Sequence, residues 1–194
     1  DEGQDGTCTG GTNDVCDTSA NANDGAITGA TWANAADCHS GSCLSFDENG
    51  QYVDSGHVYS EIDSDKNYSI CGWIKVKIDS LGIASQIISS SSRFTLDIND
   101  SVNPRIKFGH YNGSSYNSVT GLTTLIYRTW YHICAINLSD ESKFIYLDGR
   151  LDTNYVPGQN TLSPGSSARN FRLGYGAFGY FNGNIDEVIA GFLS

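Results

Sequence analysis

The amino-acid sequence predicts an all-β protein, built as a sandwich or a barrel of short strands. Two patterns predict this class: apolar and polar residues alternate within strand-length runs, and turn-forming residues separate the runs. No window repeats apolar residues at helical spacing over three turns, so no long helix is expected. The 194 residues include 11 Tyr, 8 Phe and 22 Gly but only 17% charged residues, which is typical of a loop-rich β protein and not of a disordered chain.

The clearest predicted strand is Tyr68–Ile78. Its even-numbered residues form an apolar face, and its odd-numbered residues, which include Trp73 and two lysines, form the opposite face. Turn signals such as Asn49-Gly50 and Asp148-Gly149 separate the runs. The other predicted strands are Ala26–Trp32, Cys43–Phe46, Gln51–Val53, Gln86–Ser89, Phe94–Ile98, Arg105–His110, Trp130–Leu138, Lys143–Leu147, Phe171–Tyr175 and Asn184–Phe192.

The N-terminal segment differs in composition from the rest of the chain. Residues 1–25 are rich in Gly, Asn, Asp and Thr and offer almost nothing to bury, so an irregular arm closed by a Cys8–Cys16 loop is expected. No linker or internal repeat divides the remainder. We therefore expect a disulfide-looped arm at residues 1–16 and one domain at residues 17–194. The sequence shows no signal-peptide pattern, as expected of a chain that begins after processing or of an excised domain.

The formal net charge of −11 excludes some partners. Nucleic-acid binding needs clustered Lys and Arg, and the 11 cations of this chain are scattered along the sequence. The same acidity argues against an anionic membrane surface, and no run approaches the roughly 20 apolar residues of a membrane span. Direct membrane insertion is not expected. The charge is compatible with divalent cations, with neutral glycans or simply with solubility.

The six cysteines predict an oxidising compartment, and hence a secreted or cell-surface protein. An even count predicts complete pairing, but it leaves fifteen connectivities open. A zinc site is disfavoured because no C-x2-C pair occurs. Four N-x-S/T sequons are candidate glycosylation sites in such a compartment: Asn67, Asn99, Asn112 and Asn137.

Five segments, in this order, resemble the laminin-G-like, concanavalin A-like jelly-roll superfamily, in its prokaryotic surface-protein branch. They are DTSANANDGAITGATW (17–32), CLSFDENGQYVD (43–54), YSICGWIKV (68–76), TWYHICAINLSDESKFIYLDGRL (129–151) and FRLGYGAFGYFNGNIDEVIAG (171–191). The resemblance implies two antiparallel sheets packed face to face. It does not fix the activity, because this fold carries glycan binding, adhesion, protein recognition and glycoside hydrolysis.

The resemblance also implies a cysteine pairing. Tyr68–Val76 and Trp130–Leu138 would be neighbouring antiparallel strands, which would bring Cys71 opposite Cys134. Cys38 and Cys43 are close enough in sequence to close a tight loop. With Cys8–Cys16, this gives three predicted disulfides.

A calcium site is the second implication. Domains of this type place the N-terminal segment beside the final strand, and many carry a structural Ca²⁺ there. The resemblance implies Asp17 and Asp186 as carboxylate ligands, with Asn23 or nearby carbonyls completing the oxygen shell that Ca²⁺ prefers. The alternative is that these Asp and Asn residues only form turns and cap backbone groups.

Catalysis is disfavoured. The related glucanases carry the strand motif Glu-x-Asp-x-x-Glu, and its nearest match, Glu61-Ile62-Asp63-Ser64-Asp65-Lys66, has Lys66 in place of the third acid. Asp186 and Glu187 are adjacent, so on a regular strand their side chains would point to opposite faces. No G-x-S-x-G motif occurs. We expect no enzyme activity.

Aromatic side chains are the candidate ligand-binding groups. A sugar ring offers an apolar C–H face on which Tyr can stack. Tyr111, Tyr116, Tyr155 and Tyr180 are the predicted ligand-binding residues, the first three because they lie among Gly, Ser and Asn. The leading hypothesis is a non-catalytic, calcium-stabilised module that binds a glycan or a cell-surface protein. The alternative is a structural or self-associating protein–protein subunit of a surface filament or layer, and a glycoside hydrolase ranks last.

Overall fold

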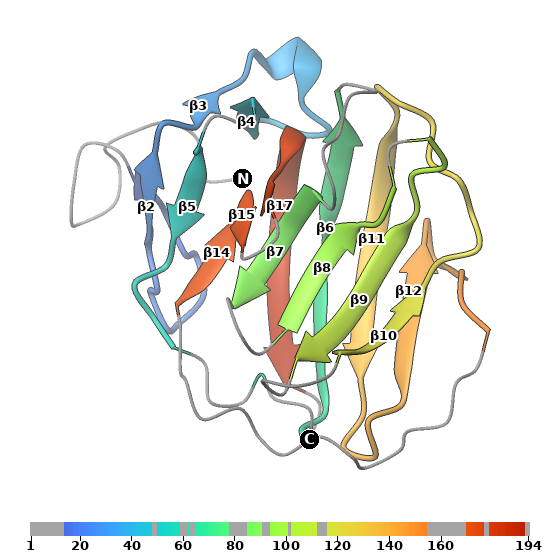
Figure 1. Ribbon diagram of the computed structural model, residues 1–194. Coiled ribbons are helices and arrows are strands. Elements are labelled where there is room, and N and C mark those ends of the chain that lie inside the picture. The colour runs from blue at the N-terminus through green and yellow to red at the C-terminus, as the bar shows by residue number, and fades with distance from the viewer. Residues whose placement is uncertain are drawn as a thin grey trace.

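The computed structural model describes residues 14–47, 50–58, 62, 65–77, 85–90, 94–100, 102–111, 116–154, 170–176 and 179–192. Its strands form two large antiparallel sheets that face each other (Figure 1), which confirms the predicted antiparallel β-sandwich. The first sheet contains β1 (Asp14–Val15), β2 (Gly25–Thr28), β5 (Tyr52–Asp54), β14 (Phe171–Leu173), β7 (Ser85–Ser90), β8 (Phe94–Ile98), β9 (Ile106–Tyr111) and β10 (Tyr116–Thr120), in that spatial order. We call it sheet A.

The second sheet, sheet B, covers the inner face of sheet A. Its strands, in spatial order, are β13 (Arg150–Leu151), β12 (Lys143–Leu147), β11 (Trp130–Asn137), β6 (Tyr68–Val76), β17 (Asn182–Phe192), β4 (Leu44–Asp47) and β3 (Thr31–Trp32). A separate hairpin pairs β15 (Tyr175–Gly176) with β16 (Gly179–Tyr180). The only helical element within the described ranges is the 3-10 turn η1 (Ala35–Asp37).

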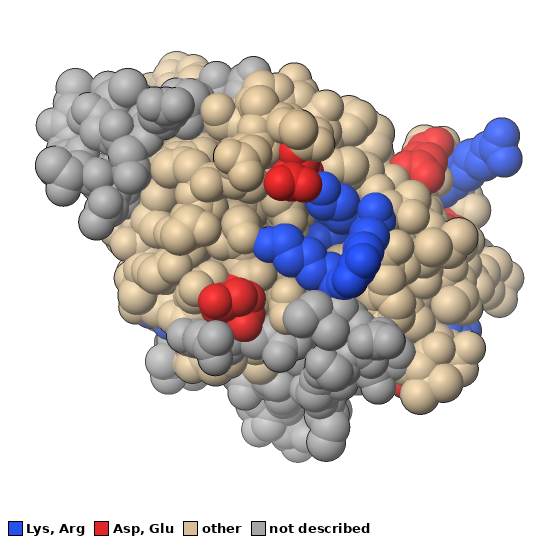
Figure 2. All heavy atoms as spheres, turned by 90° about the horizontal axis from the view of Figure 1, so that it is seen from above, with Lys and Arg blue, Asp and Glu red and all other residues tan. Residues whose placement is uncertain are grey.

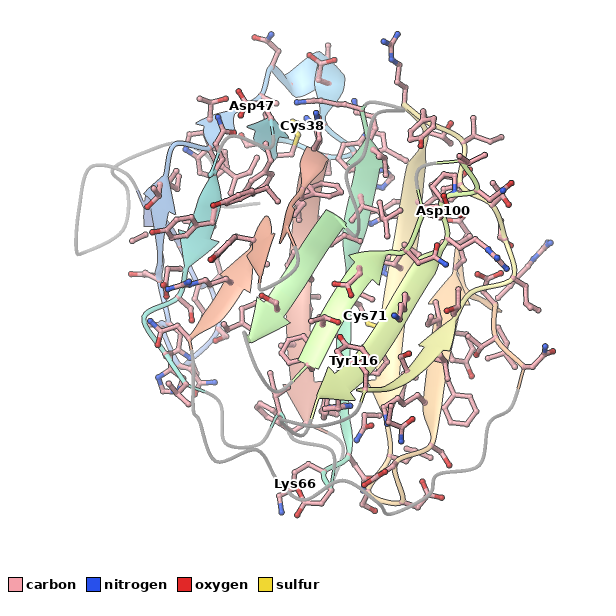
Figure 3. All side chains as sticks on the ribbon, viewed as in Figure 1. Cys38, Asp47, Lys66, Cys71, Asp100 and Tyr116 are labelled. Carbon is pink, nitrogen blue, oxygen red and sulfur yellow. A yellow bond between two sulfur atoms is a disulfide. The ribbon has the colours of Figure 1, made fainter. Side chains whose placement is uncertain are left out.

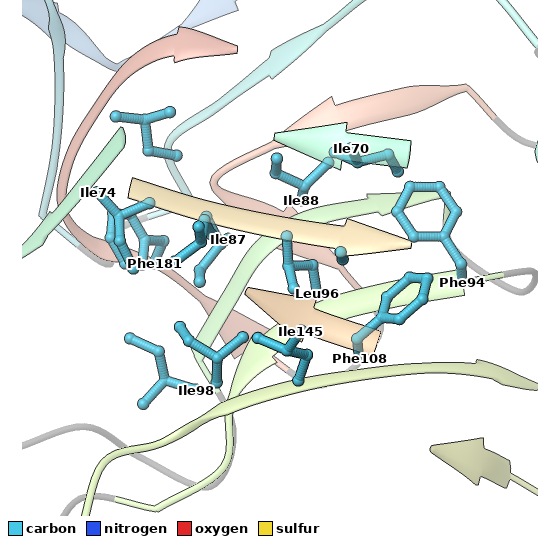
Figure 4. Close-up of a cluster of buried hydrophobic side chains, with 14 of the residues drawn as sticks. Ile70, Ile74, Ile87, Ile88, Phe94, Leu96, Ile98, Phe108, Ile145 and Phe181 are labelled. Carbon is cyan, nitrogen blue, oxygen red and sulfur yellow. The ribbon is translucent and has the colours of Figure 1, made fainter. Parts of the chain in front are cut away.

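The core lies between the sheets and follows the predicted alternation. In β6, the even-numbered residues from Tyr68 to Val76 are buried and the odd-numbered residues are half-buried. Ile70 and Ile74 from sheet B meet Leu96 and Phe108 from sheet A in the cluster of Figure 4. Each such side chain, once fully buried, stabilises the fold by roughly 1.5–3 kcal/mol. Apolar burial between the two sheets is therefore what holds the sandwich together.

Two predicted disulfides are present. Cys71 of β6 lies directly opposite Cys134 of β11 and is bonded to it, with Cα atoms 4.0 Å apart. Cys38 is bonded to Cys43 with Cα atoms 5.3 Å apart, and this bond closes the loop between η1 and β4. Cys16 is also disulfide-bonded, whereas Cys8 lies outside the described residues. The proposed boundary at residue 16 stays a prediction.

Several short strands were not predicted, and each has little apolar alternation. β10 has the sequence YNSVT, in which Val119 alone is fully buried. β1, β13 and β16 are two residues long and are defined by their pairing partners. The predicted strand Phe171–Tyr175 is broken at Gly174, whose φ of +82° is open mainly to glycine.

Candidate ligand-binding site

The outer face of sheet A carries a group of aromatic and charged side chains where β5 and β14 pair. Arg172 lies opposite Asp54, and Leu173 lies opposite the buried Val53. Residues opposite each other in a sheet project to the same face, so Arg172 and Asp54 project outward while Val53 enters the core. Tyr52 shares the outer face because it is two residues from Asp54.

Gly174 brings a further tyrosine to this face. On a regular strand, Tyr175 would project to the face opposite Arg172, three residues earlier. The left-handed backbone at Gly174 interrupts that alternation, and a Cβ at this position would lie 2.5 Å from the Phe46 ring. The Tyr175 ring consequently lies 5.7 Å from the Tyr52 ring, centroid to centroid.

Three tyrosines and one arginine lie in contact with one another and form what we call the aromatic–arginine cluster: Tyr52, Arg172, Tyr175 and Tyr180. The Tyr175 and Tyr180 rings are stacked, with centroids 4.9 Å apart and planes 23° apart. The Arg172 guanidinium carbon lies 5.2 Å from the Tyr52 centroid and 5.5 Å from that of Tyr175. Tyr180 is the outermost member and is 39% exposed. Cation–π contacts of this kind hold the guanidinium in place beside the rings.

Asp54 fixes the arginine from the other side. The Arg172 Nε–H donates to Asp54 Oδ2 at 2.8 Å, and the Gly56 N–H donates to Asp54 Oδ1 at 2.8 Å. Burial opposes ionisation of Asp54, but the Gly56 N–H, the Asn170 side chain and the Arg172 guanidinium outweigh burial, and the pKa of Asp54 is lowered. The pair remains charged at neutral pH. The cluster thus offers an apolar stacking surface next to fixed hydrogen-bonding groups.

The predicted ligand-binding tyrosines do not share one environment in the structure. Tyr180 belongs to the cluster. Tyr116, labelled in Figure 3, is half-buried with a buried hydroxyl, and it is less open than its polar sequence neighbours suggested. Its ring lies over Gly109, where a Cβ would come within 2.7 Å of Tyr116 Cε1, and Lys107 Nζ lies 5.1 Å from the ring centroid. The side chain of Tyr111 and the whole of Tyr155 lie outside the described residues.

Asp17, the first predicted calcium ligand, organises a turn in the structure. Its Oδ1 accepts the N–H of Ser19 at 2.9 Å, and its Oδ2 accepts the N–H of Asn23 at 2.9 Å. Its own N–H donates to Asp24 Oδ1 at 2.9 Å. Burial disfavours the charged carboxylate of Asp17, but the hydrogen bonds from Asn23 and Ser19 have the larger effect. The pKa of Asp17 is therefore lowered.

Asp186, the second predicted ligand, anchors the disulfide loop. Its Oδ2 accepts the N–H groups of His39 and Ser40 at 3.1 and 3.0 Å. A β-bulge between Asp186 and Ile189 interrupts strand alternation, so the expected divergence of Asp186 and Glu187 on a regular strand does not apply. Both residues line one cavity.

That cavity, of about 440 Å³, lies between the N-terminal segment and β17. Asp17, Asn23 and Asp186 all line it, above apolar residues such as Leu44 and Ile185. The three polar side chains offer carboxylate and amide oxygens, which are the ligands that Ca²⁺ prefers. The described ranges hold no cluster of three or more His, Cys, Asp or Glu side chains placed to bind a metal ion, and the Asp17 and Asp186 carboxylates already accept backbone N–H groups. The residues fit a cation only if part of this hydrogen bonding is exchanged.

One predicted glycosylation site is buried. Asn137 has an exposed fraction of 0%, and its Nδ2 donates to the carbonyls of Lys66 and Leu138 at 2.7 and 3.0 Å. A glycan on this nitrogen would displace these hydrogen bonds and has no room in the folded chain. Asn67 is exposed, Asn99 is half-buried, and Asn112 lies outside the described residues.

Within the glucanase-like segment, Ile62 is buried and Lys66 is exposed, while Glu61 and Asp63 lie outside the described residues.

The sequence matches the family Laminin_G_3, of the concanavalin A-like lectin/glucanases superfamily, over residues 47–189. The chain therefore belongs to this superfamily, as the five segments predicted. A search of curated proteins finds no matching relative. In the part of the chain that the structure describes, no helix has the length and apolar character needed to span a membrane.

Solved structures share the fold at low sequence identity. The binding domain of Paraclostridial mosquitocidal protein 1 has a TM-score of 0.67 at 13% identity, over 87% of this chain and 44% of that one. The chain thus spans less than half of that structure. Domain 4 of AbnA, a GH43 extracellular arabinanase from Geobacillus stearothermophilus, in complex with arabinotriose, has a TM-score of 0.63 at 16% identity, over 88% and 84%. The binding domain of botulinum neurotoxin serotype C1 has a TM-score of 0.64 at 13% identity, over 94% and 50%.

Proposed function

We propose that this chain is a non-catalytic glycan-binding module and that the aromatic–arginine cluster is its binding surface. The single observation that supports this most is the stack of Tyr175 on Tyr180 beside the Arg172–Asp54 pair. A pyranose or furanose ring presents C–H groups that pack on an aromatic face, and its hydroxyls need donors and acceptors at the ring edge. The cluster supplies both within one patch.

Each member has a distinct part in this proposal. Tyr180, the most open ring, receives the sugar face. Tyr175 packs against Tyr180 and Tyr52, and these contacts fix the side chains before a ligand binds. Little side-chain freedom is therefore lost on binding. The guanidinium N–H groups that Asp54 does not use donate to hydroxyl oxygens, and the Asp54 carboxylate accepts from hydroxyl groups.

The solved relatives support this class of function without fixing the ligand. One is a domain of an arabinanase in complex with arabinotriose, and two are binding domains of toxins. The absence of catalysis is part of the proposal and rests on Lys66, which stands where the glucanase motif needs its third acid. Turnover of a β-glucan that Glu61→Gln abolishes would contradict it.

A glycan array followed by titration of the best hits tests the proposal. Tyr180→Ala should weaken binding roughly tenfold or more, since an aromatic stack and its buried area contribute on the order of 1–2 kcal/mol. Arg172→Lys keeps the charge but loses the planar guanidinium and should also weaken binding. Tyr146→Ala, on the outer face of sheet B, is the matched control and should bind as the wild type does. Equal binding by all three variants would place the site elsewhere.

A protein-recognition role is the second candidate, and one surface favours it. Leu122 and Leu151 are exposed, and the Leu122 N–H donates to the carbonyl of Asp152, next to the edge strand β13. Exposed apolar groups beside a sheet edge suit a protein partner or self-association. An array without glycan hits, together with concentration-dependent self-association that Leu151→Lys removes, would favour this candidate.

We further infer that the protein is secreted or displayed on a cell surface, where its disulfides would persist. We also propose that Asp17 and Asp186 hold a structural Ca²⁺. The ion would join the N-terminal segment to β17 and would take no part in a reaction.

A further inference from the structure

A second pocket lies at the end of the sandwich where β6 ends and β11 begins. Its volume is about 740 Å³, within the range of small-molecule sites. Lys75, Lys77 and Arg128 line it, together with Trp32, Asn34, Asp37, Ser45 and Asn184. Three of the 11 cations of a chain with net charge −11 therefore meet in one hollow, although the sequence scatters them.

Figure 2 looks onto this end of the molecule. A single compact group of Lys and Arg side chains occupies its centre, with acidic side chains to either side. Asp37 lines the pocket, and Asp47 and Cys38, labelled in Figure 3, lie at the same end. The pocket therefore gathers positive charge in a protein whose net charge is negative.

The two lysines are held in place by neutral groups. Lys75 Nζ donates to the carbonyl of Asp37 and lies 5.0 Å from the Trp130 ring centroid. Lys77 Nζ donates to Ser45 Oγ at 2.5 Å. Among the described residues, none of the three cations forms an ion pair; the pairs found are Lys66–Asp65 and Arg172–Asp54. Their charges are thus available to a ligand.

Lys75 and Lys77 also destabilise each other. Burial lowers the pKa of Lys77, and the positive charge of Lys75 adds to this effect, against the opposing influence of Asp37 and Asp47. Arg128 is brought to the same hollow by a left-handed backbone, φ +64°, that a non-glycine residue adopts at a cost. An anion bound among the three would offset their repulsion.

The floor of the pocket has hydrogen-bonding capacity left over. Asn184 lies between Lys75 and Ser45 in the sheet and is 1% exposed. Its Nδ2 contacts Cys43 Sγ at 3.5 Å, and its Oδ1 has no hydrogen-bond partner among the described residues. A carboxylate or sulfate cannot donate a hydrogen bond to this acceptor, but a hydroxyl group on the same ligand can. Trp32 adds an apolar wall.

We propose that this basic pocket binds an acidic saccharide, with the carboxylate or sulfate group held among Lys75, Lys77 and Arg128. The inference rests on the proposed saccharide-binding function for the body of the ligand, but its site is separate from the aromatic–arginine cluster. The anionic group forms charge-assisted hydrogen bonds with the three cations. The sugar ring packs against Trp32, and Asn34 and Asn184 lie within the pocket to pair with hydroxyl groups.

Tryptophan fluorescence tests this site separately. The chain has three Trp residues; Trp32 lines the pocket, Trp130 lies under Lys75, and Trp73 is two residues from Lys75, while the aromatic–arginine cluster contains none. The probes are a heparin-derived oligosaccharide, an oligogalacturonate and inorganic sulfate, with a cello-oligosaccharide as the uncharged control. The expected result is a saturable change with the two acidic saccharides that weakens as salt concentration rises.

Single variants locate the site. Lys77→Gln and Arg128→Gln should each weaken binding of the acidic saccharides roughly tenfold. Lys107→Gln, on the outer face of sheet A, and Tyr180→Ala should leave this signal unchanged, so the pocket can succeed or fail independently of the aromatic–arginine cluster. Melting temperatures of all variants check that they are folded. An equal response to the cello-oligosaccharide, equal loss in Lys107→Gln, or no response to any acidic saccharide would overturn the proposal. Inorganic sulfate that binds as tightly as the saccharides would overturn the saccharide assignment.

Discussion

The imidazole ring of His39 lies face to face with the indole ring of Trp73, with centroids 3.5 Å apart and planes 17° apart. The loop closed by Cys38–Cys43 thereby covers a tryptophan that the alternation of β6 places on the outer face of sheet B. Asp186 completes the attachment, because its carboxylate accepts the N–H groups of His39 and Ser40. A ring stack and two charge-assisted hydrogen bonds thus hold this loop to the sheet.

Removal of either contact should loosen the loop. Asp186→Asn keeps the shape but removes the charge, and we expect a loss of about 1–2 kcal/mol, or several degrees in melting temperature. His39→Ala should uncover Trp73 and shift its fluorescence to longer wavelength. The exposed His57→Ala serves as the control. An unchanged melting temperature in both variants would show that the disulfide alone holds the loop.

Gly174→Ala should damage the aromatic–arginine cluster selectively. A Cβ would meet the Phe46 ring at 2.5 Å, and the positive φ is unfavourable for alanine. We expect a loss of stability above 1 kcal/mol and weaker glycan binding than in Gly56→Ala, which has a similar φ of +64° but open space around it. Equal effects of the two substitutions, in urea unfolding and in glycan titration, would indicate backbone strain alone.

The two observed disulfides should contribute unequally. Loop-closure entropy grows with the number of residues enclosed, and the separations are 63 for Cys71–Cys134 and 5 for Cys38–Cys43. The chain-entropy relation gives about 4 kcal/mol for the longer loop and about 2 kcal/mol for the shorter one. Paired Cys→Ala variants, unfolded in guanidinium, measure the difference. Peptide mapping without reduction tests the third bond, Cys8–Cys16.

Stability should rise with pH between about 8 and 10. Burial of the ammonium lowers the pKa of Lys143 to about 8, while in the unfolded chain it is about 10.4. Between these values the unfolded state holds a proton that the folded state has lost, so raising the pH favours folding. Lys143→Met should lack this rise and be at least as stable near pH 7, whereas Lys107→Met should keep it. A wild-type curve that is flat over this interval would contradict the pKa shift.

Calcium binding is testable by chelation. A ligand that binds only the folded chain adds about 2.7 kcal/mol to the free energy of unfolding at a hundredfold excess over Kd. For a domain of this size, each kcal/mol raises the melting temperature by roughly 2–4 °C. EDTA should lower the melting temperature, and Asp17→Ala should abolish that sensitivity. Should EDTA and millimolar Ca²⁺ give the same melting temperature, Asp17 and Asn23 form only the turn seen in the structure.

The sandwich was predictable because its long strands carry their own pattern. β6 alternates over nine residues, and this alternation also placed Cys71 on the outer face of sheet B. The aromatic–arginine cluster was predicted only in part, through Tyr180. Tyr52 and Arg172 meet because β5 pairs with β14, and Asp54 and Arg172 are 118 residues apart in sequence. The basic pocket was missed for the same reason, since Arg128 reaches Lys75 and Lys77 only in the folded chain.

β17 lies in the middle of sheet B, between β6 and β4, although it comes last in the described sequence. The ribosome must therefore synthesise residue 185 before β4 can complete its ladder with β17, and residue 192 before β6 can, and both strands keep an unpaired edge until then. Such long-range pairing slows folding and leaves strand edges open to aggregation. A chain shortened before Asn182 should bind holding chaperones during synthesis instead of forming half a sandwich.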